Sequence, residues 1–94
     1  MLWIVTIRHK GLAAFYNRDD RKGLPQKLVK RIAALLPVLD AAQGPEELNI
    51  SGLGLHPLKG NLKGYWAVSV SGNWRLIFRF ENKAIHDLDL TDYH

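Results

Sequence analysis

The order of hydrophobic and polar positions divides the chain into a mainly helical first half and a second half of strands. Residues 2–7 are mostly β-branched or aromatic, which is typical of a strand. Residues 9–17 carry apolar side chains on one side of a short predicted helix. After Pro25, a second helix is predicted by apolar residues at helical spacing, namely Leu28, Ile32, Leu35 and Leu39. Because Pro37 lacks an N–H group, we expect it to kink this helix or end it near Leu36.

The second half of the chain favours strands. Three are expected, over residues 65–71, 74–80 and 84–90. Residues 45–48 are expected to form one more helical turn before them. Gly72-Asn73 lies between two of the strands and is typical of a two-residue hairpin turn. The resulting order, β-α-α-β-β-β, predicts one α+β domain over residues 1–94, with the helices packed on one face of an antiparallel sheet.

The predicted hairpin also indicates which side chains share a face of the sheet. With residues 72–73 as the loop, Val70 would lie opposite Arg75, and directly opposite residues share a face. One face would carry Trp66, Val68, Val70, Arg75, Ile77 and Arg79. The other would carry Tyr65, Ala67, Ser69, Trp74, Leu76, Phe78 and Phe80. Because the second set is larger and uncharged, we assign it to the core under the helices. The last strand should add Leu88 and Leu90 to that core and place Asp87 and Asp89 beside the arginines.

Charge is distributed unevenly along the chain. The net charge is +4, with +6 in residues 1–39 and −2 in residues 40–94. A basic first half indicates an anionic partner, and nucleic acid is the first candidate. A solvated basic helix face accounts for the same charge equally well.

Composition limits the classes of protein and site to be considered. The chain contains no cysteine, which excludes disulfides, thiol catalysis and cysteine-based zinc sites and fits the cytoplasm. No charged-then-apolar leader opens the chain, and no apolar run approaches the roughly 18 residues that span a bilayer. The histidines are not at metal-ligand spacing. We therefore expect a cytoplasmic protein with no membrane association, metal or cofactor.

Several residues in the final part of the chain could together cut RNA without a metal. His56 precedes Pro57, and Asp92, Tyr93 and His94 end the chain. A histidine can take the proton of a ribose 2′-hydroxyl near neutral pH, and a second acid can protonate the departing 5′-oxygen. Arginine and lysine can hold the phosphate as its charge builds. Taken alone, each of these residues is more often structural or simply exposed, so the residues make the chemistry possible without requiring it.

The segments around these candidates carry a family resemblance. It rests on residues 54–66, which include His-Pro-Leu-Lys-Gly, and on residues 69–75, 78–81, 87–89 and 92–94. Together they resemble the signature of HigB-type toxins, a branch of the RelE superfamily. Lys10-Gly11-Leu12 also looks like the family, although the first half is otherwise less similar.

The resemblance implies a single RelE-like domain that acts as the toxin of a bacterial toxin–antitoxin pair. It implies an endoribonuclease that cuts mRNA in the ribosomal A site without a metal. The 2′-hydroxyl would attack the adjacent phosphate and leave a cyclic phosphate end. It also implies a HigA-type helix-turn-helix antitoxin, with which the toxin represses their shared operon. Operator DNA would therefore be contacted only through the antitoxin.

The site implied by the resemblance surrounds one scissile phosphate. Its catalytic residues would be His56, Lys59, Arg75, Asp92, Tyr93 and His94. Lys59 and Arg75 would clamp the phosphate, and Lys63 and Lys10 would bind RNA. The general base and general acid stay unassigned among the proton-transfer groups.

Two alternatives stay open at this point. The first is a non-catalytic RNA- or ribosome-binding module, in which the same cations bind but nothing is cut. The second is a DNA-binding repressor subunit. It would need a recognition helix with polar base-reading side chains, whereas residues 25–39 supply an apolar stripe.

Overall fold

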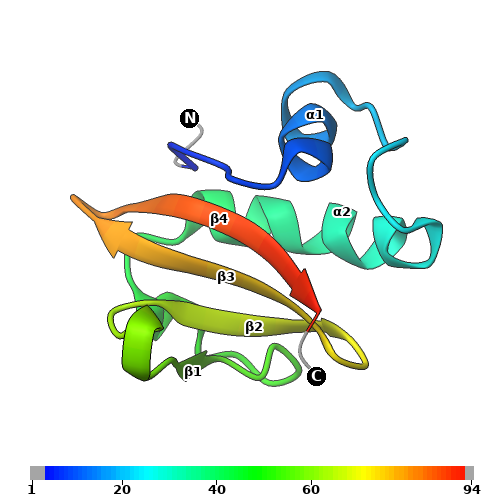
Figure 1. The fold of residues 1–94 in the computed structure, drawn as a ribbon. Helices are drawn as coiled ribbons and strands as arrows, with labels where there is room; N and C mark the ends of the chain where they lie inside the picture. Colours follow the sequence, from blue (N-terminus) through cyan, green and yellow to red (C-terminus); the bar gives the residue numbers. More distant parts are fainter. Residues whose placement is uncertain (1–3, 93–94) are drawn as a thin grey trace.

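Two helices pack on one face of a four-stranded antiparallel sheet in the computed structural model, which describes residues 4–92 (Figure 1). The helices are α1 (Lys10–Arg18) and α2 (Gln26–Ala41), with short 3₁₀ turns η1 (Pro45–Leu48) and η2 (Gly60–Leu62). The strands, in their order across the sheet, are β1 (His56–Pro57), β2 (Trp66–Ser71), β3 (Trp74–Glu81) and β4 (Ala84–Asp92). The predicted α+β class is confirmed, as are both helices and the turn at 45–48. Neither described helix is long and apolar enough to cross a membrane.

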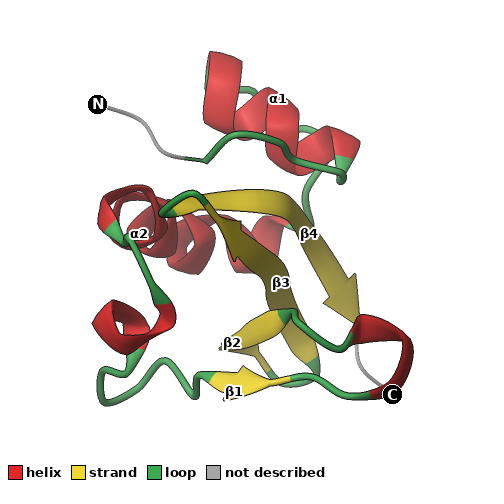
Figure 2. Ribbon diagram, turned by 90° about the vertical axis from the view of Figure 1, so that its left-hand side faces the viewer, coloured by secondary structure: helices red, strands yellow, loops and turns green. Residues whose placement is uncertain are grey.

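Residues 4–7, the described part of the first predicted strand, do not form a regular strand. Ile4 and Ile7 form only isolated parallel bridges, with Ile85 and Leu88 of β4. Between these bridges, β4 bulges at Asp87, whose φ of 54° breaks the ladder of backbone hydrogen bonds. The fourth strand of the sheet is instead β1, at the opposite edge (Figure 2). Residues 4–7, where the first strand is predicted, thus contact the β4 edge, but through isolated bridges.

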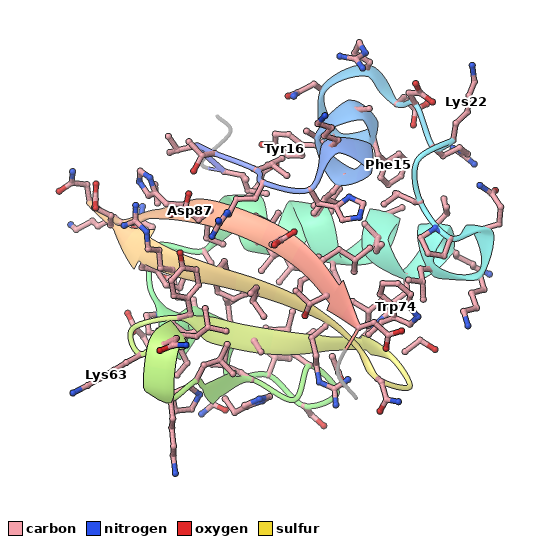
Figure 3. All side chains as sticks on the ribbon, viewed as in Figure 1. Phe15, Tyr16, Lys22, Lys63, Trp74 and Asp87 are labelled. Carbon is pink, nitrogen blue, oxygen red and sulfur yellow. The ribbon has the colours of Figure 1, made fainter. Side chains whose placement is uncertain are left out.

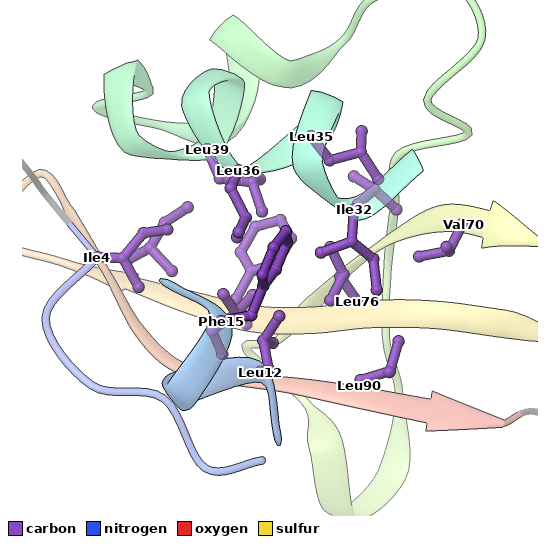
Figure 4. Packing of buried hydrophobic residues seen from close by; sticks show 14 of the residues in the cluster. Ile4, Leu12, Phe15, Ile32, Leu35, Leu36, Leu39, Val70, Leu76 and Leu90 are labelled. Atoms are coloured by element: carbon purple, nitrogen blue, oxygen red, sulfur yellow. The ribbon is translucent and has the colours of Figure 1, made fainter. Parts of the chain in front are cut away.

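Local contacts fix the start of α1. His9 caps the helix, since its Nδ1 accepts a hydrogen bond from the Leu12 N–H at 3.1 Å. Gly11 lies against Gly23 so closely that a Cβ atom on Gly11 would be 2.2 Å from the Gly23 carbonyl oxygen. Only glycine permits this approach, which holds the loop between the helices against α1. Leu12 and Phe15 then point into the core (Figure 4).

Helix α2 continues through Pro37 to Ala41, so of the two expected outcomes, a kink or an end near Leu36, the end does not occur. Leu35, Leu36 and Leu39 flank the proline and are buried against the sheet (Figure 4). Burying a leucine stabilises by roughly 1.5–3 kcal/mol, whereas a proline inside a helix costs about 3 kcal/mol. Continuing the helix keeps all three leucines in the core, so their packing outweighs the cost of the proline.

Replacing the exposed Pro37 with alanine should stabilise the protein. Alanine restores the N–H that bonds the Ala33 carbonyl and removes the clash of the ring with it. The free energy of unfolding should rise by about 1–3 kcal/mol in urea denaturation. Pro25→Ala is the control, because Pro25 precedes the first turn of α2, where no N–H is needed. A loss of stability in Pro37→Ala would contradict this account.

The pairing of β2 with β3 follows the prediction at the turn and departs from it one residue later. Ser71 lies opposite Trp74, as the two-residue turn requires. The register then shifts, so Arg75 lies opposite Ser69 and not opposite Val70. This bulge reconciles the turn with the burial of Val70, which would otherwise face away from the helices.

The bulge reverses both predicted faces of β2, while those of β3 are confirmed. Leu76, Phe78, Leu88 and Leu90 are buried under the helices, and Phe80 packs partly buried against them. The same core holds Trp66, Val68 and Val70, which the sequence placed on the other face (Figure 4). Ala67 and Tyr65 instead join Ile77 on the face away from the helices. The larger apolar side chains of β2 thus decide its orientation, and the turn does not.

Candidate active site

The face of the sheet away from the helices, here called the open face, carries two of the predicted catalytic residues. One row of paired residues crosses it as His56, Ala67, Ile77 and Asp89. The next row runs Ser69, Arg75 and Thr91. His56 and Arg75 therefore share a face, two strands and two residues apart, with Cα atoms about 12 Å from each other. Within residues 4–92, no three His, Asp or Glu side chains are grouped as a metal site would require.

His56 lies half-buried in β1, at the edge of the sheet. Its Nδ1 lies 3.1 Å from the Gly54 carbonyl oxygen, which favours a proton on Nδ1 and leaves Nε2 as the basic nitrogen. Pro57 keeps residue 56 extended and, lacking an N–H, is suited to an edge strand. This geometry suits His56 to accept a proton at Nε2.

The hairpin turn orients Arg75. Its Nη1 donates to the carbonyl oxygens of Gly72 at 2.8 Å and Trp74 at 3.1 Å. A guanidinium has five N–H donors, so others remain for a phosphate. Asp89, which we expected to orient an arginine, instead accepts a hydrogen bond from the Leu90 N–H at 3.0 Å. The carbonyl groups of the turn hold Arg75.

The C-terminal end of β4 lies beside this hairpin. Asp92 is exposed and pairs with Trp74, which packs against the core on the helix side. Successive residues of a strand belong to opposite faces of the sheet. Thr91 belongs to the open face, so Asp92, which follows it, belongs to the helix side. The predicted catalytic residues Tyr93 and His94 lie outside the described residues.

The three predicted lysines do not gather at one point. Lys59 and Lys63 flank η2 and are exposed, and Lys63 extends away from the sheet in Figure 3. Along the strands, Lys59 is displaced by about five residues from Arg75, which corresponds to roughly 15–20 Å between Cα positions. Lys10 begins α1, beyond the β4 edge of the sheet. By this spacing, Lys59 lies toward the other end of the open face from Arg75.

A polar cluster occupies the other end of the open face, at Asp87 (Figure 3). Arg79 pairs through Nε with Asp87 and through Nη1 with Glu81, both at 2.8 Å. Its hydrogen bonds to Glu81 and Asp87 raise the pKa of Arg79, and the same bonds lower the pKa of both carboxyl groups. The prediction that Asp87 lies beside an arginine is confirmed, and the two residues form an ion pair. The Tyr65 hydroxyl also donates a hydrogen bond to Asp87, a contact that no sequence pattern indicates.

Residues 5–94 match the family described as the RelE-like toxin of the type II toxin–antitoxin system HigB. The chain belongs to the HigB family of toxins. A HigB relative, Endoribonuclease HigB of Proteus vulgaris, is 40% identical over 91 residues, covering 97% of this chain and 99% of its own. Toxin HigB-1 of Vibrio cholerae serotype O1 is 37% identical over 75 residues, covering 78% of this chain and 79% of its own.

The fold is also similar to that of a solved structure. The YoeB dimer from Staphylococcus aureus matches with a TM-score of 0.56 and 26% sequence identity, over 99% of this chain and 97% of its own. Membership of a type II toxin–antitoxin family also gives this HigB-family chain an antitoxin protein as its partner.

Proposed function

We propose that this HigB-family toxin is an endoribonuclease that cuts mRNA in the ribosomal A site without a metal ion. The observation that carries the proposal is the placement of His56 and Arg75 on one open face, beside the end of β4. The name of the Proteus vulgaris relative supports the reaction class. Tyr93 and His94 complete the proposed catalytic set by their position in the sequence, and Asp92 precedes them from the opposite face of β4.

The proposed reaction is an internal transfer at phosphorus. The 2′-oxygen loses its proton to a base, forms a bond to the phosphorus, and displaces the 5′-oxygen, which takes a proton from an acid. The products are a 2′,3′-cyclic phosphate and a 5′-hydroxyl. His56 and the C-terminal residues share the proton transfers, and Arg75 stabilises the charge that builds on the phosphate oxygens.

The lysines receive a different role from the one the sequence suggested. Because Lys59 lies far from Arg75, we assign Lys59 to the RNA backbone together with Lys63. A cation at either position can neutralise a phosphate outside the reacting one. The catalytic clamp then consists of Arg75 alone among the described cations. Lys10 stays a proposed RNA contact, on a different side of the molecule.

The other proposed partners follow from charge and family. The basic first half exposes several cations around α1 and α2, namely Lys10, Arg18, Arg21, Lys22, Lys27 and Lys30. We propose that this surface binds ribosomal RNA in the cytoplasm. The proposed antitoxin is of the HigA type, with a helix-turn-helix domain. In the complex, operator DNA is contacted only through this antitoxin.

Primer extension on mRNA from translating cells, after a pulse of the toxin, tests the proposal. We expect cuts within codons, cyclic phosphate ends, and no cuts in the same RNA without ribosomes. With purified ribosomes, EDTA at a concentration too low to dissociate the ribosomes should not inhibit mRNA cleavage. Equal cutting of naked RNA would contradict ribosome dependence. Ribosome binding without any cutting would favour the non-catalytic module.

A further inference from the structure

The connection from β1 to β2 forms a small closed loop, residues 58–65, which we call the lysine loop. Four hydrogen bonds within it join the Leu58 N–H to the Tyr65 oxygen (2.9 Å), Leu62 to Lys59 (3.2 Å), Lys63 to Gly60 (3.1 Å) and Tyr65 to Leu62 (2.9 Å). These bonds give the loop a shape of its own. They do not fix how the loop sits on the sheet.

Apolar contacts attach the lysine loop to the open face. Leu58 is buried there with Ala67 and Ile77, and Leu62 and Tyr65 pack against them. This second core is much smaller than the one under the helices. Few apolar contacts make a segment easy to open locally. The position of the lysine loop therefore depends on its polar contacts as well.

One polar contact crosses the sheet from the lysine loop to β4. The Tyr65 hydroxyl donates to Asp87 Oδ2 at 3.4 Å, while Arg79 Nε donates to the same oxygen at 2.8 Å. Tyr65 precedes β2 and Asp87 lies in β4, so the contact spans β3. Asp87 thus joins the lysine loop to the far edge of the sheet.

Asp87 is itself held in place. Its N–H donates to Thr6 Oγ1 at 2.7 Å, and the Thr6 hydroxyl donates back to Asp87 Oδ1 at 3.3 Å. With a φ of 54°, Asp87 adopts a left-handed conformation that is uncommon for a residue other than glycine. The surrounding bonds maintain this conformation, which aims the carboxylate at Arg79 and Tyr65.

We propose that Asp87, acting through Tyr65, is a positioning residue that holds the lysine loop over the open face, so that Lys59 and Lys63 meet the RNA backbone on the side of His56. This inference rests on the proposed function, because it assigns those lysines to RNA. Strand β1 is held separately at its other end, where the Ser69 N–H donates to the Leu53 oxygen at 2.7 Å. Loosening the loop should therefore weaken RNA binding and leave the catalytic step at His56 nearly unchanged.

Tyr65→Phe tests the proposal without changing charge or ring packing. The concentration of toxin that half-saturates cleavage on programmed ribosomes should rise about threefold to tenfold, because the loop would be correctly placed for a smaller fraction of the time. The maximal rate should stay within about twofold. Asp87→Asn should also weaken binding to the ribosome. The change makes the toxin more basic, so electrostatics alone would have the opposite effect and tighten binding.

Tyr16→Phe is the matched control. The Tyr16 hydroxyl also donates to an aspartate, Asp40, but between the two helices. Burial and this bond raise the pKa of Tyr16. Tyr16→Phe should lower the melting temperature and leave half-saturation unchanged.

Two further measurements separate positioning from general stability. In a Lys59→Ala/Lys63→Ala background, Tyr65→Phe should raise the half-saturating toxin concentration by less than about 1.5-fold, because the loop then carries no cation to position. Amide hydrogen exchange at Leu58, Leu62, Lys63 and Tyr65 should accelerate about tenfold in Tyr65→Phe and Asp87→Asn, but not in Tyr16→Phe.

The proposal is overturned if loop exchange is unchanged in both variants, or if Tyr65→Phe has its full effect without the lysines. Absence of cleavage by the unaltered toxin would refute the proposed function and, with it, the RNA role of the loop. Exchange in the same samples would still decide whether Asp87 and Tyr65 order the loop.

Discussion

Removal of His94, or the change His56→Ala, should each lower the rate of mRNA cleavage by about 10²–10⁴-fold. Each histidine is proposed to transfer a proton in the same displacement at phosphorus. When two groups act in the same transition state, removing either one already loses most of the rate enhancement that the pair provides. The chain with both changes should therefore be only slightly slower than the slower single variant. Single-turnover cleavage on programmed ribosomes measures all three rates.

The fold and the antitoxin interaction should survive these histidine changes. His56 is half-buried at a sheet edge, outside both cores, and His94 follows β4, the last strand of the sheet, in the sequence. The matched control is His9→Asn, since asparagine also caps helices and His9 lies at the start of α1. Its rate should stay within about threefold of the parent. Cleavage at the parental rate by the chain lacking His94 and carrying His56→Ala would place the active site elsewhere.

Arg75→Ala should lower cleavage by about 10²–10³-fold, the effect of losing one donor to a developing negative charge. Ribosome binding should fall much less, because one phosphate contact is a small part of a large electrostatic interface. Arg75→Lys should recover only part of the rate, since an ammonium cannot keep two turn carbonyls and a phosphate in the planar geometry of a guanidinium.

Binding and cleavage measured on the same ribosomes separate these effects of Arg75. Lys83→Ala is the control, because Lys83 is an exposed cation in the turn between β3 and β4 and has no role in the proposed site. It removes one positive charge, as Arg75→Ala does, and should leave the rate unchanged once ribosomes are saturating. A loss of ribosome binding as large as the loss of cleavage in Arg75→Ala would show that Arg75 serves docking and not the reaction.

Local sequence signals determined the elements whose geometry needs no distant contact. Gly72-Asn73 set the two-residue turn, and Pro25 preceded α2. The alternation along β3 placed Leu76 in the core and Arg75 on the open face. In each case a turn, a cap or a period is a property of a few neighbouring residues. The candidates His56, Arg75 and Asp92 were likewise found from short segments and their family resemblance.

The spacing of the site could not be read from those segments. Lys59 and Arg75 both fit a phosphate clamp in the sequence, yet their separation depends on how β1 pairs with β2 and β2 with β3. Strand β1 is only two residues long and has no strand pattern of its own. The role of Asp87 as a joint between Thr6, Arg79 and Tyr65 was equally hidden, because its partners lie far apart in the chain.

The sequence by itself therefore determined the fold class, the turns, the helices and the residue types available for chemistry. Tertiary structure decided the course of α2 through Pro37, the isolated bridges of the N-terminal segment and the bulges at Val70 and Asp87. The physical reason is the same in each case. Going against a local conformational preference costs up to about 3 kcal/mol at one residue, and burying several large side chains together outweighs that cost. Which side chains are buried together is settled only when the helices meet the sheet.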